Sequence, residues 1–185
     1  SCSPHNPTGA VTSADELSEL VEACREHDAL LLADECYCDL YEDEPPPSAL
    51  EVAGPTLEGV LSYLSLSKRS GMTGYRSGAM VGDARAISAL REIRSSVGVA
   101  PQEFVQAAAI AAWSDDAHAA ERRGIFAAKR AVLRRPFDEL GHEVVGSRAG
   151  IYLWVAVGDD LAVTERLLEG GVVVSPGRIF GAGGE

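Results

Sequence analysis

The stretch that decides the fold spans residues 65–76 and reads Ser-Leu-Ser-Lys-Arg-Ser-Gly-Met-Thr-Gly-Tyr-Arg. It follows an apolar run, residues 59–64, that is typical of a β-strand. A lone lysine at a strand end, here Lys68, can bond covalently to an aldehyde cofactor. Arg76, eight positions later, offers the planar guanidinium that suits a phosphate group. By itself such a run more often forms a polar loop, so the rest of the chain must decide.

The composition predicts a globular protein that binds neither nucleic acid nor membrane. The 185 residues, 46% hydrophobic and 24% charged, suffice for one ordinary domain or parts of two. The 28 acidic residues outnumber the 16 basic ones, and a net charge of −12 disfavours polyanionic partners. No apolar run approaches the roughly 20 residues of a membrane span, and the N-terminus has no signal-peptide pattern. We therefore expect a cytoplasmic protein.

The four cysteines all lie within the first 38 residues. We expect them to be buried thiols in a reducing compartment. Cys36 and Cys38 are two positions apart, which is neither a redox-pair spacing nor a usual zinc spacing. A metal site made of Cys2, His5, Cys36 and Cys38 is a less favoured alternative, and we assign no metal.

The first third of the chain alternates helix and strand signals. Residues 6–9, Asn-Pro-Thr-Gly, predict a turn. Ser13 and Glu16 form a capping box that should begin a helix running to about His27. The continuous apolar run at residues 29–33 predicts a strand buried on both faces of a parallel sheet. This alternation indicates an α/β fold.

The middle of the chain continues with a loop, a strand and two helices. Residues 41–55 form an acidic, proline-rich loop, and residues 77–82 read as a short strand. Asp83 should cap a helix to about Ser96, with Ile87, Leu90 and Ile93 on one face. An alanine-rich helix is expected at residues 104–113, after a break at 97–101.

A long amphipathic helix, residues 115–140, should join two parts of the chain, with Pro136 kinking or interrupting it. Beyond it the pattern predicts strands at 144–145, 151–155 and 172–174, and a helix from an Asp160 cap to Leu168. We predict two domains, residues 1–120 and residues 121–185, with the boundary between about 118 and 140.

Three blocks, residues 6–9, 34–37 and 65–76, stand in an order and spacing that resemble the class I/II aminotransferases, which use pyridoxal 5′-phosphate (PLP) on fold type I. The resemblance continues to Ser-Pro-Gly at 175–177 and Phe-Gly at 180–181. It implies an α/β three-layer sandwich with a mostly parallel sheet, forming a partial large domain, plus a partial α+β small domain. Within the family, the sequences of residues 65–76 and 97–102 are most similar to those of N-succinyldiaminopimelate aminotransferases.

The resemblance assigns catalytic roles to Lys68, Asp34 and Tyr37. Lys68 would bind the cofactor covalently and then move the proton between the substrate Cα and the cofactor. Asp34 would form a charge-assisted hydrogen bond to the protonated ring nitrogen of PLP. Tyr37 and Asn6 would hydrogen-bond the phenolic oxygen of the cofactor.

The phosphate ligands implied by the family are Ser65 and Arg76. Simpler readings remain open for two of the site residues, since Asp34 could be a turn or helix-cap residue and Asn6 a plain turn residue. Tyr152 and Trp154 would either pack in the core or approach the substrate. Ser67 is expected to pack, and Arg69 and Arg178, without a family role, to be salt-bridged or solvent-facing.

The family implies that an amino acid, expected to be glutamate, gives its amino group to a keto acid. The subgroup points to N-succinyl-2-amino-6-ketopimelate of lysine biosynthesis. A PLP-dependent carbon–sulfur β-lyase and a non-catalytic PLP-binding regulator are the alternatives, because reaction type is not fixed by fold. We expect small-molecule substrates and a homodimer.

Both ends of the chain suggest a piece of a longer protein. The upstream phosphate loop and ring-stacking aromatic residue of the family are not in these 185 residues, nor is the downstream arginine that binds the substrate carboxylate. We expect the isolated piece to lack full activity.

Overall fold

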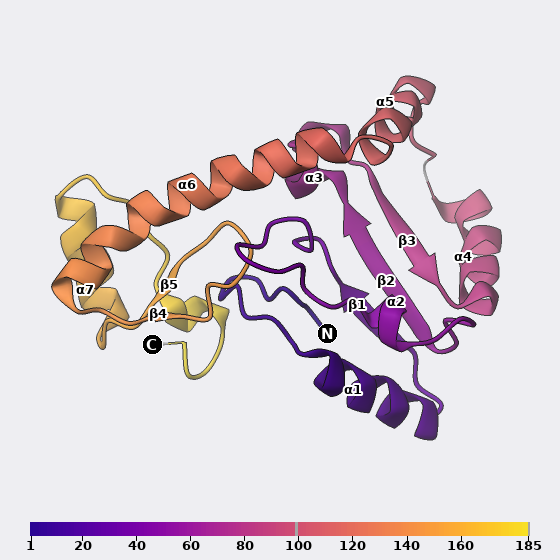
Figure 1. Cartoon of the computed structure of the whole chain (residues 1–185), viewed down its shortest axis with the longest axis horizontal. Coiled ribbons are helices and arrows are strands. Elements are labelled where there is room, and N and C mark those ends of the chain that lie inside the picture. Colours follow the sequence, from indigo (N-terminus) through magenta and orange to yellow (C-terminus); the bar gives the residue numbers. More distant parts are fainter. Residues whose placement is uncertain (99, 185) are drawn as a thin grey trace.

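A computed structural model describes residues 1–98 and 100–184 and has a mixed α/β architecture (Figure 1). Its main sheet contains β1 (Leu31–Asp34), β2 (Val60–Ser65) and β3 (Gly78–Gly82), in that order. β1 and β2 are parallel, whereas β2 and β3 are antiparallel. The N-terminal segment runs parallel to the other edge of β1, where Cys2 bridges Asp34. Three parallel segments therefore end at one edge of the sheet.

Two helices, α1 (Ala14–Glu26) and α2 (Ala49–Val52), pack together and supply the core of the main sheet. The predicted capping box begins α1, since Ser13 and Glu16 exchange side-chain to backbone hydrogen bonds. α2 lies inside the stretch predicted as a loop, and a second capping box at Ser48 begins it. The shared core consists of buried apolar side chains: Val21, Leu31, Ala33, Ala49, Ala53 and Val60.

Burial along β1 differs from the expectation of a strand covered on both faces. The strand spans Leu31–Asp34 rather than residues 29–33, and burial alternates along it. Leu31 and Ala33 are buried against the helices, whereas Leu32 is 49% exposed. In the described part of the chain, α1 and α2 pack on the face of β1 that holds Leu31 and Ala33, so the prediction for the face that holds Leu32 was wrong.

Helices α4 (Ala84–Val97) and α5 (Glu103–Trp113) agree with the sequence pattern, and Asp83 caps α4 as predicted. The apolar face of α4 is open at its C-terminal end, since Ile93 is 59% exposed. The break between these helices includes position 99, which lies outside the described residues. Helix α6 (Asp116–Leu140) continues past Pro136, so the proline does not interrupt it.

A second, two-stranded sheet lies toward the other end of α6 from β1–β3 (Figure 1). This sheet pairs β4 (Val144–Val145) with β5 (Trp154–Val155). β5 is shorter than the strand predicted at residues 151–155. α7 (Asp160–Glu169) follows and is capped by Asp159 rather than Asp160. Residues 172–174 do not form the predicted strand, and the short 3-10 helix η2 (Gly177–Phe180) follows. The domain boundary near 118–140 stays a prediction.

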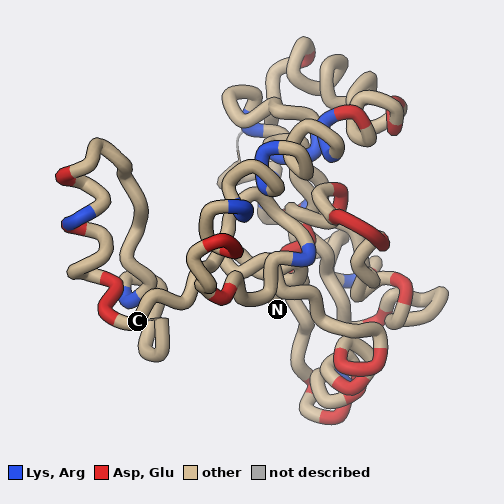
Figure 2. The backbone as a smooth tube through the Cα atoms, turned by 60° about the vertical axis from the view of Figure 1, so that its left-hand side comes forward, with Lys and Arg blue, Asp and Glu red and all other residues tan. Residues whose placement is uncertain are grey.

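Charge is unevenly distributed over these elements (Figure 2). Helix α1 carries acidic residues from its first turn onward, whereas α6 carries three adjacent basic pairs, at 122–123, 129–130 and 134–135. Among the described residues, no helix combines the length and apolar character needed to cross a bilayer.

Asp83 provides a test of how the start of α4 is fixed to the sheet. Its carboxylate accepts hydrogen bonds from the backbone N–H of Gly59 at 2.9 Å and of Arg85 at 2.8 Å. These donors, Gly59 first, lower the pKa of Asp83 from 3.8 to about 2. A lowered pKa means that the stabilisation is present above pH 3.8 and is lost as the pH falls through about 2.

We predict that Asp83→Asn lowers the free energy of unfolding of the full-length protein near neutral pH and flattens its pH dependence between 3.8 and about 2. Urea unfolding across this range measures both effects. Asp43→Asn, in an exposed loop, is the control and should change stability near neutral pH by less than about 0.5 kcal/mol. An unchanged acid slope in Asp83→Asn would contradict the assignment.

Candidate functional site

The predicted site residues begin where the parallel segments end. Asp34 is the last residue of β1, and Ser65 is the last residue of β2. The N-terminal segment leaves the same edge, because the Ser3 N–H donates to the Asp34 carbonyl at 3.1 Å, three residues before Asn6. Ligands of α/β proteins generally bind beyond the carboxyl ends of parallel strands.

Lys68 lies in a short helix, α3 (Leu66–Arg69), that starts directly after β2. Ser65 caps this helix, and its Oγ accepts the Ser67 N–H at 3.1 Å. The half-buried Lys68 directs its Nζ over the ring of Tyr37, 5.9 Å from the centroid. The structure thus brings together a lysine and a tyrosine that are 31 positions apart in the chain, within the range of a cation–π contact.

Tyr37 is buried, with 6% of its surface exposed. Burial raises the pKa of its phenol, and the neighbouring Tyr152 phenol raises the pKa further. Tyr37 therefore remains a neutral hydroxyl that can donate a hydrogen bond. Tyr152 lies beside Tyr37 and is 45% exposed, so it borders the site and is not part of the core. Trp154 instead packs edge-on against Phe180, with 5.6 Å between the ring centroids.

Asp34 interacts with Cys36 through both the backbone and the thiol of that residue. Its Oδ1 accepts the Cys36 N–H at 3.0 Å, and its carboxylate also interacts with the Cys36 thiol. Burial and the adjacent Asp34 raise the pKa of the Cys36 thiol to about 12, and burial raises the pKa of Cys38 to about 12 as well. Both thiols therefore remain protonated near neutral pH in this environment.

Arg76 follows the 3-10 turn η1 (Thr73–Tyr75), where β3 approaches the end of β2. One guanidinium nitrogen donates to the Thr73 carbonyl at 2.9 Å, and the Thr73 hydroxyl donates to the Ser67 carbonyl at 3.3 Å. The Leu66 N–H donates to the Ser77 carbonyl at 3.3 Å, so the backbone next to Ser65 meets the backbone next to Arg76. The remaining guanidinium N–H groups have no partner among described residues.

Asn6 is exposed in a turn that the Gly9 N–H closes on the His5 carbonyl at 2.7 Å. Its side chain makes no hydrogen bond to Tyr37 or Lys68 within the described structure. The Asn6 turn is nevertheless joined to the Tyr37 turn through residues 147–150. The Ser147 backbone N–H donates to the Thr8 carbonyl at 2.8 Å, and the Gly150 backbone N–H donates to the Leu40 carbonyl at 2.7 Å.

Three arginines next to this site were missed or left unassigned by the sequence analysis. Arg130 of α6 is 3% exposed; it donates to the carbonyls of Ser147 and Gly150 and pairs with Glu42 at 3.2 Å. Arg69 follows Lys68 in α3 and pairs with Asp39, and Arg122 of α6 donates to the Lys68 carbonyl. For the two arginines of α6 the sequence shows only basic residues on an amphipathic helix, which is also the pattern of a solvated helix, so no local signal distinguishes them.

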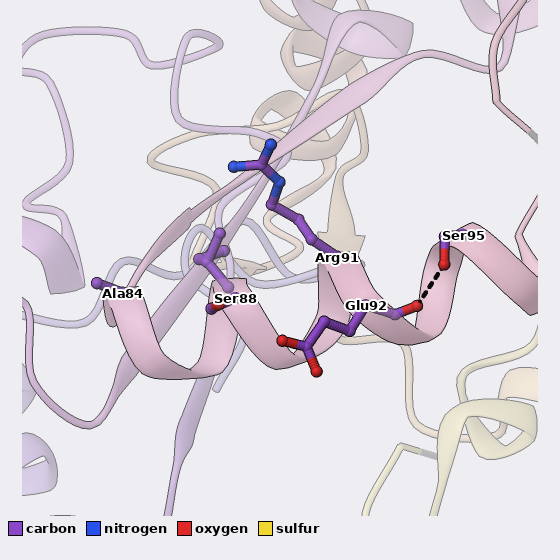
Figure 3. A pocket seen from close by; sticks show the side chains of 6 residues that line it. Ala84, Ser88, Arg91, Glu92 and Ser95 are labelled. Carbon is purple, nitrogen blue, oxygen red and sulfur yellow. Dashed lines mark hydrogen bonds between the residues drawn. The ribbon is translucent and has the colours of Figure 1, made fainter.

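An open surface depression lies elsewhere, on one side of α4 (Figure 3). Ala84, Ser88, Arg91, Glu92 and Ser95 of this helix line it, together with Ile87. The only dashed contact drawn is local, between the Ser95 hydroxyl and the Glu92 carbonyl at 2.7 Å. None of the predicted site residues lines this depression, so shape alone does not locate the site.

The profile of the family "Aminotransferase class I and II" matches residues 1–185. This chain belongs to the class I and II aminotransferase family. It is 40% identical to 4-dedimethylamino-4-oxo-anhydrotetracycline transaminase OxyQ of Streptomyces rimosus, with 99% of this chain and 52% of that protein covered. It is 34% identical to LL-diaminopimelate aminotransferase 2 of a Nostoc species, with 98% and 48% covered.

Among solved structures, an aminotransferase from Neisseria meningitidis superposes with a TM-score of 0.91 at 33% identity, covering 100% of this chain and 49% of that one. The predicted fold class is thereby confirmed as part of the fold type I architecture. The chain spans about half the length of the relatives it matches.

Members of the family depend on PLP, and the chemistry of the side chains at this edge fits that group. Asp34 offers a carboxylate oxygen for a protonated ring nitrogen, and Tyr37 offers a neutral hydroxyl for a phenolic oxygen. Lys68 offers an amine for an aldehyde. For the phosphate, Ser65 has a hydroxyl and Arg76 a guanidinium with open donors.

The raised pKa of Tyr37 predicts how stability depends on alkaline pH. Because the folded pKa lies above the ordinary value of 10.0, the stabilisation is complete below pH 10 and is lost as the pH rises through the folded pKa. The free energy of unfolding of the full-length protein should therefore fall above pH 10, and less steeply in Tyr37→Phe. Guanidinium unfolding at successive pH values measures the slopes; identical slopes would show that Tyr37 is not buried as described.

Proposed function

We propose that the full-length protein containing this chain is a PLP-dependent aminotransferase, with the cofactor held by Asn6, Asp34, Tyr37, Ser65, Lys68 and Arg76. The observation that carries the proposal is the placement of the Lys68 amine 5.9 Å from the Tyr37 ring centroid, beside strand ends that present Asp34 and Ser65. Family membership supports the same cofactor.

When bound, PLP supplies an electron sink for the electron pair left on the substrate Cα after it loses a proton. Lys68 takes up that proton and returns it on the cofactor side, which requires a free amine close to both atoms. Asp34 keeps the ring nitrogen protonated through a charge-assisted hydrogen bond. Tyr37 and Asn6 would each donate a hydrogen bond to the phenolic oxygen, and Ser65 and Arg76 would bind the phosphate.

The substrates we propose are glutamate as amino donor and a keto acid as acceptor, with N-succinyl-2-amino-6-ketopimelate as the specific candidate. The likeness to an LL-diaminopimelate aminotransferase supports a dicarboxylic substrate of related chemistry. The 40% identity to a transaminase named for a tetracycline intermediate favours a different acceptor. The alternatives are a carbon–sulfur β-lyase and a PLP-binding regulator. The activity assay must distinguish the aminotransferase from both.

We further propose, from the resemblance to the family, that the full-length protein is a cytoplasmic homodimer with a large domain ending near residue 120 and a small domain from residue 121. Analytical ultracentrifugation of the full-length protein would give the mass of a dimer; a monomer at working concentration would contradict this part of the proposal.

Lys68 is one of only two lysines in this sequence, which makes its role easy to isolate. We predict that borohydride reduction of the PLP-loaded full-length protein attaches the cofactor to Lys68, as peptide mass mapping would detect. Lys68→Ala should abolish transamination, because both the covalent anchor and the proton carrier are lost. Lys129→Ala is the matched control, since Lys129 lies on the exposed side of α6 over Phe126, and it should retain wild-type activity. An adduct on another lysine would overturn the assignment.

Substrate class can be read from half-reactions. We predict that glutamate converts the visible absorbance of the cofactor to that of its amine form and that a keto acid restores it. A panel of keto acids that includes N-succinyl-2-amino-6-ketopimelate should identify the acceptor by the largest kcat/KM. Pyruvate and ammonia release from cystathionine without amino transfer would instead favour the β-lyase, and PLP binding without either reaction would favour the regulator.

A further inference from the structure

Three consecutive residues at the end of α3 and just beyond it are held by the first two turns of α6. The Lys68 carbonyl accepts a hydrogen bond from Arg122 Nε at 2.9 Å. Arg69 pairs with Asp116 at 2.5 Å. The Ser70 hydroxyl lies 2.8 Å from His118 Nε2. The helix that leads away from the main sheet is therefore attached to the backbone that carries the Lys68 amine.

Arg69 also reaches the other side of the site. Its second terminal nitrogen pairs with Asp39 at 2.7 Å, two residues after Tyr37. The guanidinium lies over the ring of Trp113 at 5.4 Å, and the side chain is only 7% exposed. Burial disfavours its charge, but the hydrogen bonds and charges of Asp116 and Asp39 outweigh burial and raise the pKa of Arg69.

This arrangement addresses a weakness of α3. A helix of four residues is too short to be stable by itself, because nucleation of the first turn costs more than its few hydrogen bonds return. Its position must come from tertiary contacts. The planar fork of arginine can bind two carboxylates on different segments at once, which a lysine ammonium on a flexible stem does less well.

We propose that Arg69 is a positioning residue that fixes the separation of Lys68 and Tyr37 by clamping α3 between the Asp39 turn and the start of α6. This inference rests on the proposed function of Lys68. Arg69 does not touch the reacting atoms in this account; it holds the backbone from which the Lys68 amine reaches them. Displacement of about 1 Å in such a group can reduce the rate by up to about a hundredfold.

The test compares Arg69→Met, Arg69→Lys and Arg91→Met in the full-length protein. Methionine keeps much of the side-chain volume but removes both ion pairs, whereas lysine keeps the charge without the fork. Arg91 is the matched control: it is exposed on α4, and its side chain extends along the depression of Figure 3.

The first readout needs no cofactor. Hydrogen exchange of the PLP-free protein should show faster exchange in residues 66–72 of Arg69→Met, by about tenfold or more, with α1 unchanged, because local anchoring alone is lost. Arg91→Met should exchange like the wild type. Equal protection of residues 66–72 in Arg69→Met and wild type would overturn the clamp.

The second readout separates positioning from simple stability. In Arg69→Met we expect kcat to fall at least about tenfold while the KM for the amino acid changes less than about twofold, because only the proton-transfer geometry is disturbed. Arg69→Lys should recover part of the loss. An unchanged kcat for the folded variant, even with a lowered melting temperature, would reduce Arg69 to a structural role.

Two further variants keep the proposal testable if Arg69→Met does not fold. Asp116→Asn removes one partner whose side chain is 94% exposed, and Arg122→Met removes the contact to the Lys68 carbonyl. Both should lower kcat in the same direction by a smaller factor; wild-type kcat in both would overturn the proposal. If the wild-type protein gives no cofactor adduct on Lys68, the proposed function fails. If the adduct forms on Lys68 but every variant behaves like the wild type, only the proposed role of Arg69 is rejected.

Discussion

The parallel alignment of the N-terminal segment, β1 and β2 is the constraint on which the rest of the structure depends. Backbone hydrogen bonds between Ser3 and Asp34, and the register that sets Asp34 opposite Tyr63, force three chain segments to leave the sheet at one edge. Side chains that are far apart in sequence, above all Asp34 and Lys68, then share one region without needing direct bonds to each other. The core beneath α1 and α2 maintains this alignment by burying Leu31, Ala33 and Val60.

The same region is held from a second direction by arginine side chains. Arg130 joins α6 to residues 147–150, which contact the turns of both Asn6 and Tyr37. Arg69 and Arg122 join α6 to α3. An arginine suits such positions because its fork bonds several acceptors while remaining charged when largely buried. Helix α6 is thus a structural part of the site as well as a connection to the second sheet.

Local signals were sufficient for much of the fold and insufficient for its long-range packing. Ser13 and Asp83 were recognised as caps because capping depends on residues within one turn, and the length of α6 follows from a pattern within the helix itself. The prediction that β1 is buried on both faces failed at Leu32 because a hydrophobic run does not reveal which face of a strand is covered. The apolar run at 172–174 does not form the predicted strand. The residues of the site were named from motifs, and their roles remain predictions. The partners of Arg69, which lie 30 and 47 positions away, could not be inferred from any local pattern.

The central claim is that Lys68, Tyr37 and Asp34 surround a PLP molecule at this sheet edge. A crystal structure of the full-length protein grown with PLP tests it most directly. We predict continuous density from Lys68 Nζ to the cofactor, with Asp34 at the ring nitrogen and the Tyr37 hydroxyl at the phenolic oxygen. PLP bound elsewhere, or bound here with Lys68 turned away from it, would contradict the account.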